Sequence, residues 1–181
     1  MKFMTGKVLV LLFCVLGVVV SDGPFTPKGK GPNVVAQVVT MIDEHGIFPD
    51  DNKFLCRVAW VESKYGTNSR TYRPFYYGGI WQVDQIGWLD TVQRPSLRKY
   101  HQRIKDVFKI DWTKTSWADL QKPFYSGLAA RLLLATVPAA IPPSYDLEAQ
   151  GQYWKKYYNR SGAGTAEKFV SDVRQAYGCA V

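Results

Sequence analysis

The 181-residue sequence has few residues suited to metal or redox chemistry, with only three cysteines and two histidines. His45 and His101 lie far apart without a neighbouring metal-ligand motif, so zinc catalysis has little support. Nucleophile-elbow, phosphate-loop and calcium-loop motifs are also absent, which excludes the commonest hydrolase and nucleotide-binding classes. We therefore expect no metal and no cofactor.

Long apolar runs are absent after residue 21. Residues 1–21 combine Lys2 and Lys7 with the nearly unbroken apolar run Val8–Val20, and a small residue at position 21 fits a cleavage site. This run is too short to span a membrane comfortably, so residues 1–21 are predicted to be a signal peptide. An uncleaved signal anchor is the alternative. The rest of the chain is predicted to be secreted, extracellular and without stable membrane insertion.

The predicted mature chain is basic, with 21 basic and 15 acidic residues and a formal net charge of +6. A secreted basic protein is drawn toward anionic partners, which outside the cell means bacterial wall, acidic glycans or membrane surfaces more readily than nucleic acid. The basic segment from Arg98 to Lys105 is interpreted as a solvated helix face. We expect no nucleic-acid partner and a monomer.

Two cysteines remain after the predicted cleavage, because Cys14 lies in the signal peptide. Cys56 and Cys179 form an even pair in an oxidising compartment and are predicted to be bridged. Two buried thiols are the alternative.

Hydrophobic periodicity predicts one mainly α-helical domain over residues 33–181, preceded by a flexible segment rich in Pro, Gly and Lys at residues 22–32. Asn33 and Ser144 are the expected N-caps of the first and fifth helices. Residues 66–95 show no clear period and are expected to form a long irregular loop or a small β hairpin that carries function. Helices are expected over residues 33–46, 51–65, 96–109, 124–135, 144–158 and 165–177.

Glu62 is unusual because it shares a helix face with apolar residues. In a helix, Glu62 falls within about 60° of Leu55, Val58 and Ala59. Lost hydration on such a face raises the pKa of a carboxyl group, which lets it hold a proton near neutral pH as a general acid must. The alternative is a solvated surface glutamate near a helix C-terminus.

Three short segments follow a set order. Glu62-Ser63-x-Tyr65 precedes Gly78-Gly79-Ile80-Trp81-Gln82-Val83, and Tyr158-Asn159 comes late in the chain. In order they resemble the three motifs of the lytic transglycosylase and goose-type lysozyme superfamily. The loop between the first two motifs is about two residues longer than is usual there, Trp81 stands where Met is usual, and a glycine follows Tyr65. The resemblance implies a lysozyme-like helical domain.

The resemblance also implies roles for individual residues. Glu62 would be the catalytic acid/base, and one glutamate would suffice because the N-acetyl group of the substrate can assist and a sugar 6-hydroxyl can replace water. Hydrolysis and anhydro-sugar-forming transfer both remain open. Ser63 and Tyr65 would support Glu62, Gln82 would line the sugar cleft, and Tyr158 would form a hydrogen bond near Glu62. The expected substrate-binding residues are Ser63, Tyr65, Gly79, Trp81, Gln82 and Tyr158.

Further candidates come from the chemistry of glycoside cleavage, which commonly uses two carboxyl groups. Asp84, with Asp90 behind it, is a candidate second carboxylate, and a turn or cap residue is the alternative for Asp84. Aromatic planes suit the apolar faces of pyranose rings. The expected cleft aromatics are Trp81, Trp88 and Tyr76-Tyr77, whereas Trp60 and Trp154 are expected in the core.

Asn159-Arg160-Ser161 is an N-glycosylation sequon, which would place Asn159 at the surface if it were used. A glycan there would argue against Tyr158 lying in a cleft.

The sequence therefore predicts a secreted enzyme that cleaves the β-1,4 bond between N-acetylmuramic acid and N-acetylglucosamine of peptidoglycan, with chitin as a second candidate substrate. Because fold does not fix function, the alternative is a catalytically silent secreted glycan-binding or extracellular-matrix protein on the same scaffold.

Overall fold

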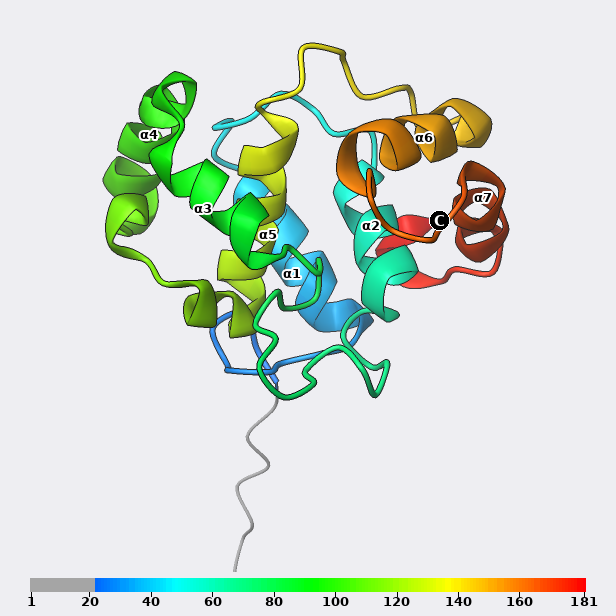
Figure 1. Cartoon of the computed structure of the whole chain (residues 1–181), viewed down its shortest axis with the longest axis horizontal. Helices are drawn as coiled ribbons and strands as arrows, with labels where there is room; N and C mark the ends of the chain where they lie inside the picture. Colours follow the sequence, from blue (N-terminus) through cyan, green and yellow to red (C-terminus); the bar gives the residue numbers. More distant parts are fainter. Residues whose placement is uncertain (1–21) are drawn as a thin grey trace, which may run out of the picture.

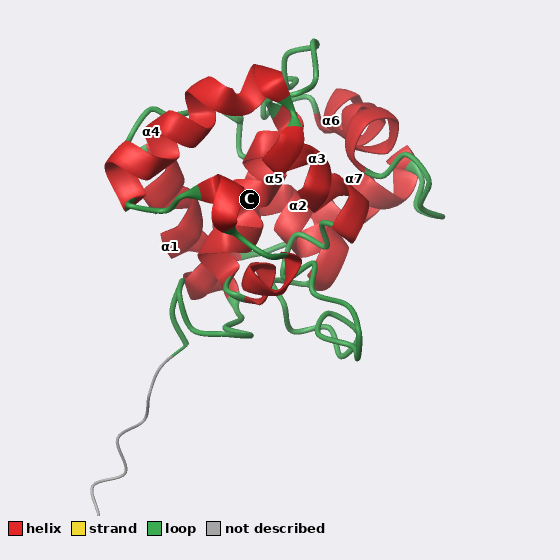
Figure 2. Cartoon of the chain, turned by 60° about the vertical axis from the view of Figure 1, so that its left-hand side comes forward, coloured by secondary structure: helices red, strands yellow, loops and turns green. Residues whose placement is uncertain are grey.

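The computed structural model describes residues 22–181, and the predicted signal peptide at residues 1–21 lies outside the described residues. Over this range the fold is mainly α, as predicted, with seven α-helices and no strand, so the β hairpin alternative is wrong (Figures 1 and 2). The helices are α1 (Pro32–Asp43), α2 (Phe54–Ser63), α3 (Gln85–Gln93), α4 (Arg98–Phe108), α5 (Pro123–Leu134), α6 (Leu147–Tyr153) and α7 (Ala166–Arg174).

Helix α5 forms the centre of the molecule. Ten of its twelve residues are buried, as expected for a helix that is apolar on every side. Gly127 permits close packing, because a Cβ atom there would lie 2.6 Å from the Val38 Cγ1 atom of α1. In Figure 1, α5 and α1 lie between α3 and α4 on one side and α2, α6 and α7 on the other.

Helix α2 is the buried helix that carries Glu62, and seven of its ten residues are buried. It ends at Ser63, two residues earlier than predicted, because Lys64 and Tyr65 adopt left-handed backbone conformations. The Lys64 amide donates to the Trp60 carbonyl at 2.8 Å, which satisfies part of the helix end. The chain turns sharply just after Glu62.

Helix α3 is absent from the sequence prediction, which was wrong to leave all of residues 66–95 irregular. Asp84 caps this helix, and its carboxylate accepts from the Gly87 amide at 2.7 Å. Ile86 is 81% exposed, so an apolar residue faces solvent and the helical period is hidden.

Two predicted helix starts are also wrong. Helix α1 begins at Pro32, so Asn33 lies inside it, and no side chain caps this helix. Helix α6 is capped by Asp146, whose carboxylate accepts from the Ala149 amide at 2.9 Å, and Ser144 lies before that cap. Helix α1 thus starts at a proline, whose fixed φ suits the first helical position, and α6 starts after a side-chain cap.

The segment before α1, predicted to be flexible, is irregular and makes several contacts with the rest of the fold. The Lys28 amide donates to the Gln121 carbonyl at 2.8 Å, and the Phe124 amide donates to the Pro24 carbonyl at the same distance. The Phe25 ring packs against Phe124 with 5.0 Å between centroids. These contacts fasten residues 22–31 to the start of α5.

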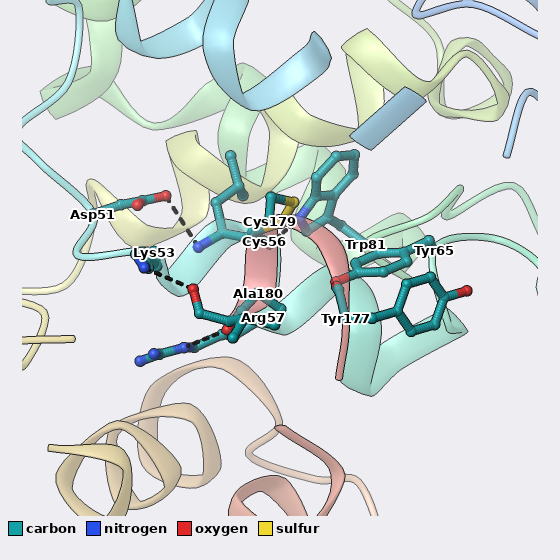
Figure 3. The surroundings of a disulfide bond; sticks show 11 residues. Asp51, Lys53, Cys56, Arg57, Tyr65, Trp81, Tyr177, Cys179 and Ala180 are labelled. Atoms are coloured by element: carbon teal, nitrogen blue, oxygen red, sulfur yellow. Dashed lines mark hydrogen bonds between the residues drawn. A yellow bond between two sulfur atoms is a disulfide. The ribbon is translucent and has the colours of Figure 1, made fainter. Parts of the chain in front are cut away.

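The predicted disulfide between Cys56 and Cys179 is confirmed, with 5.9 Å between the Cα atoms (Figure 3). It joins α2 to the C-terminal segment, residues 177–181. The Arg57 Nε atom donates to the Ala180 carbonyl at 3.1 Å, and the Lys53 Nζ atom donates to the Val181 carbonyl at 2.6 Å. The C-terminal segment thus holds the first turn of α2.

Candidate active site

Glu62 lies in the last turn of α2 and is half-buried. Burial raises the pKa of the Glu62 carboxyl to about 7, although a hydrogen bond from Trp154 opposes the shift. At neutral pH both the acid and the carboxylate are therefore populated. This is the protonation behaviour that a group must have to donate and later accept a proton.

Trp154 is the hydrogen-bond partner of Glu62, with its indole Nε1 donating to Glu62 Oε1 at 2.9 Å. Trp154 is 2% exposed and packs on Phe169, so its prediction as a core residue is confirmed, but its contact with Glu62 was not predicted. An indole nitrogen only donates. In the neutral acid Oε1 is therefore the carbonyl oxygen, and the transferable proton is on Oε2.

A π-helical turn, Trp154–Tyr158, follows α6 and presents two side chains to this region. π-Helical turns often occur at functional sites. The Tyr158 hydroxyl donates to the Trp81 carbonyl at 2.7 Å. Burial, followed by the charge of Glu62, raises the pKa of Tyr158 well above its usual range. Through Trp154 and Tyr158 this turn contacts both Glu62 and the Trp81 backbone, so the three segments of the resemblance meet in space.

Gly79 and Trp81 are placed differently from the prediction. A Cβ atom at Gly79, which has a left-handed φ of 64°, would lie 2.0 Å from the Leu120 carbonyl oxygen. The glycine is thus required by close backbone packing. Trp81 is 0% exposed, and its Nε1 donates to the Leu55 carbonyl at 2.8 Å. Both were predicted to bind substrate, and both are buried in this structure, so neither residue is open to a ligand in this conformation.

Ser63 and Tyr65, which were predicted to support Glu62 and to bind substrate, fix the end of α2. Both are buried. The Ser63 hydroxyl donates to the Ala59 carbonyl and accepts from the Gly66 amide. The Tyr65 hydroxyl donates to the Tyr177 carbonyl at 2.5 Å. Their contribution to Glu62 is to set the position of the turn beneath it.

Gln82 lines a cavity, but its amide already has internal partners. Its Nε2 donates to the Gly79 carbonyl at 2.7 Å and to the Thr71 carbonyl at 3.2 Å, and its Oε1 accepts from Arg73 at 2.9 Å. These bonds hold residues 71–82 together. In this conformation, the amide of Gln82 shapes the wall of the cavity.

Asp84 is both the cap of α3 and a charged group facing the site. Its charge raises the pKa of Tyr158 and of Tyr76, after the larger effect of burial. Burial raises the pKa of Tyr76 to about 12, and the Glu62 carboxylate contributes a smaller increase. Two carboxylates, Glu62 and Asp84, therefore lie near the same two phenols.

The cavity beside this cluster has a volume of about 400 Å³, in the range of ligand sites. It lies between the start of α3 and the π-helical turn, and Glu62 is not among the residues that line it. Charged and aromatic side chains of its wall include Asp84, Asp90, Arg94, Tyr157, Tyr158 and Arg160.

The remaining predicted site residues are Trp88, Tyr77 and Asn159. Trp88 is half-buried and its indole donates to the Thr115 hydroxyl at 3.3 Å, so it is mainly a packing residue. Tyr77 packs edge-on against Trp117 with 5.3 Å between centroids. Asn159 is half-buried at the end of the π-helical turn. The contact of Trp154 with Glu62 was not predicted from the sequence. The only indication was that Trp154 lies four residues before Tyr158.

No protein-family model, curated protein or solved structure matches this chain. Over residues 22–181, no group of three or more His, Cys, Asp or Glu side chains is arranged to hold a metal ion. In the same range, no helix has the length and apolar character needed to cross a bilayer. The function must therefore be argued from the residues around Glu62.

Proposed function

We propose that the protein is a secreted glycosidase-type enzyme that cleaves the β-1,4 bond between N-acetylmuramic acid and N-acetylglucosamine of peptidoglycan. The observation that carries this proposal is the half-buried Glu62 carboxyl, whose pKa is raised to about 7 and which has one fixed donor, Trp154. The resemblance of three segments to the lytic transglycosylases and goose-type lysozymes supports the substrate class. A disulfide suits an oxidising, extracellular location.

The first step is general acid catalysis. Glu62 donates the proton on Oε2 to the glycosidic oxygen, and the C1–O bond breaks with its electron pair going to that oxygen. The Trp154 indole stabilises the carboxylate that forms, because a hydrogen bond to a charged acceptor is stronger than one to a neutral acceptor. The positive charge on the sugar is relieved in the second step.

In the second step Glu62 acts as a base. Its carboxylate takes a proton from a water molecule that attacks C1, which gives hydrolysis, or from the 6-hydroxyl of the same sugar, which gives an anhydro product. Either route restores the neutral acid, and a pKa near the working pH suits both directions of transfer. If Asp84 is instead the second carboxylate of a hydrolytic route, Asp84 takes the proton of the attacking water, and Glu62 regains its proton from solvent after the product leaves.

A catalytically silent glycan-binding protein is the second candidate, and one observation favours it. The Gln82 Nε2 atom donates to two backbone carbonyls, its Oε1 accepts from Arg73, and Trp81 is buried. Two residues that the resemblance assigns to sugar contact are therefore engaged within the protein. In this reading the carboxyl of Glu62 contributes to binding or to structure only.

Purified peptidoglycan incubated with the protein, followed by mass spectrometry of the released muropeptides, tests the proposal. We expect cleavage by the wild type and a loss of about 10²- to 10⁴-fold in Glu62→Gln, the usual contribution of one acid/base group. Glu167→Gln is the matched control, because its carboxyl is exposed on α7, and it should retain activity.

The products also separate the branches of the mechanism. Muropeptides one water lighter than hydrolysis products would assign intramolecular transfer, and ordinary reducing ends would assign hydrolysis. Asp84→Asn should lower the rate in the hydrolytic case alone. Intact polymer that binds wild type and Glu62→Gln equally would reject the enzyme and favour the silent glycan-binding protein.

A further inference from the structure

Left-handed backbone conformations outside glycine need a compensating contact, since L-residues adopt them at a steric cost. At most such positions the compensation is visible. Lys64 and Lys109 terminate α2 and α4. Tyr65 is buried and hydrogen-bonded, and the amide of Gln82 holds a loop together. Phe75 is different from all of these.

Phe75 has a φ of 61°, and its side chain is 89% exposed. It occupies the third position of a turn closed by the Tyr76 amide donating to the Arg73 carbonyl at 3.3 Å, with Pro74 at the second position. A positive φ after proline is the pattern of a type II turn, which favours Gly or Asn at the third position. The turn does not explain a phenylalanine there, and no packing stabilises the ring.

This turn is clamped to the candidate active site on both sides of Phe75. The Tyr76 hydroxyl donates to the Gln82 carbonyl at 2.6 Å, and Arg73 bonds the Gln82 amide oxygen at 2.9 Å. The Arg73 guanidinium also lies 3.5 Å from the centroid of the Tyr76 ring. Gln82 lines the cavity, so hydrogen bonds join the turn that carries Phe75 to a residue of the cavity wall.

We propose that Phe75 forms an outer sugar-binding position, where its ring stacks on the apolar C–H face of a pyranose in the glycan strand. This inference rests on the proposed function and extends the site beyond the bond that is cleaved. A phenyl ring has no polar group, so it suits the face of a sugar better than a carboxylate of a peptide stem. The hydrogen bonds of Arg73 and Tyr76 fix the backbone that carries the ring before binding, which lowers the entropic cost of binding.

Stability separates this role from a structural one. If Phe75 had a structural role, its replacement by glycine would lower the melting temperature. If the ring is exposed and makes no contacts, glycine should raise the melting temperature, because it removes the steric strain of the left-handed backbone. We therefore expect Phe75→Gly to be more heat-stable than the wild type and yet to bind glycan strands more weakly. Tyr145→Gly is the matched control, because Tyr145 is 88% exposed but lies in the segment before α6.

The experiment uses soluble, uncross-linked glycan strands prepared from peptidoglycan. Binding is measured by calorimetry in the Glu62→Gln background, and KM and kcat are measured in the otherwise wild-type protein. Phe75→Gly should weaken binding and raise KM by about three- to tenfold, the range of one aromatic contact. Phe75→Tyr should restore both values, and Tyr145→Gly should change neither.

The outcomes distinguish this inference from the proposed function. Unchanged KM and binding in Phe75→Gly, or a lower melting temperature, would overturn the outer position, while Glu62-dependent cleavage would leave the proposed function intact. Wild-type protein that neither binds nor cleaves the strands would overturn both. Weakened binding with a raised melting temperature supports the outer position alone.

Discussion

The two ends of α2 handle a buried charged group in opposite ways. At its first turn the Arg57 side chain donates to the Ala180 and Ser144 carbonyls and to the Gln150 amide oxygen, at 3.1, 2.8 and 2.8 Å. At its last turn the Glu62 carboxyl accepts a single hydrogen bond within the described residues. The Arg57 guanidinium is thus hydrogen-bonded on several sides, whereas the Glu62 carboxyl keeps a proton that can be transferred.

This difference shows how a helix can carry a poorly solvated acid without losing its position. A buried charge without partners is costly, so the pKa of Glu62 rises and the neutral form becomes populated. The Cys56 disulfide and the Arg57 bonds hold the opposite end of the same helix. Stability is thus concentrated at one end and reactivity at the other.

Removing the disulfide at the first turn of α2 should have the largest effect on the stability of the fold. The Cys56–Cys179 disulfide closes a span of 123 residues, for which the chain-entropy model gives about 5 kcal/mol. We expect the double variant Cys56→Ser with Cys179→Ser to lower the free energy of unfolding by roughly that amount, measured by urea denaturation. A reductant should lower the wild type similarly and leave the double variant unchanged. Equal midpoints with and without the disulfide would contradict the comparison.

Removing the charge of Glu62 should raise the free energy of unfolding, whereas removing the disulfide lowers it. Because the folded-state pKa of Glu62 is about 7, against 4.5 for an unperturbed glutamate, its contribution to stability is complete below about pH 4.5 and is lost as the pH rises to about 7. Glu62→Gln should therefore stabilise the fold at pH 8, by on the order of 3 kcal/mol at most, and leave it unchanged at pH 4. Thermal unfolding across this pH range measures the difference.

Glu167→Gln serves as the control for this prediction. Hydrogen bonds at the start of α7 lower the pKa of the Glu167 carboxyl, so its removal at pH 8 should destabilise the fold if it has any effect. A pH-independent effect of Glu62→Gln would mean that the carboxyl is not desolvated.

Removing the hydrogen-bond donor of Glu62 should have the smallest effect of the three changes to α2 and its partners. Trp154→Phe keeps an aromatic ring beside Phe169 but removes the donor to Glu62. Because that hydrogen bond lowers the pKa of Glu62, the alkaline limb of the pH–rate profile should move to higher pH, and kcat should fall several-fold. Trp60→Phe removes another indole bond, to the Asp172 carbonyl, and should leave the limb in place. A lower kcat with an unmoved limb would reduce Trp154 to a packing residue.

Periodicity was sufficient to predict most helices and to single out Glu62, because these features depend on which residues share one buried face. It failed at α3, where Ile86 faces solvent and the cap of Asp84 is the clearest sign of the helix. It also misplaced Trp81, since the direction of an aromatic side chain in a loop follows from tertiary packing alone. The Trp154 contact arises from two helices meeting in space, which one sequence does not specify.

The disulfide has a consequence for the order of events in the cell. Cys56 leaves the ribosome 123 residues before Cys179, a delay of roughly 6 to 25 s at ordinary rates of synthesis. Until then Arg57 lacks its Ala180 acceptor and Tyr65 lacks the Tyr177 carbonyl. The helix that carries Glu62 is therefore fastened only after residues 177–180 have been synthesised, and a shorter nascent chain does not yet hold its acid in place.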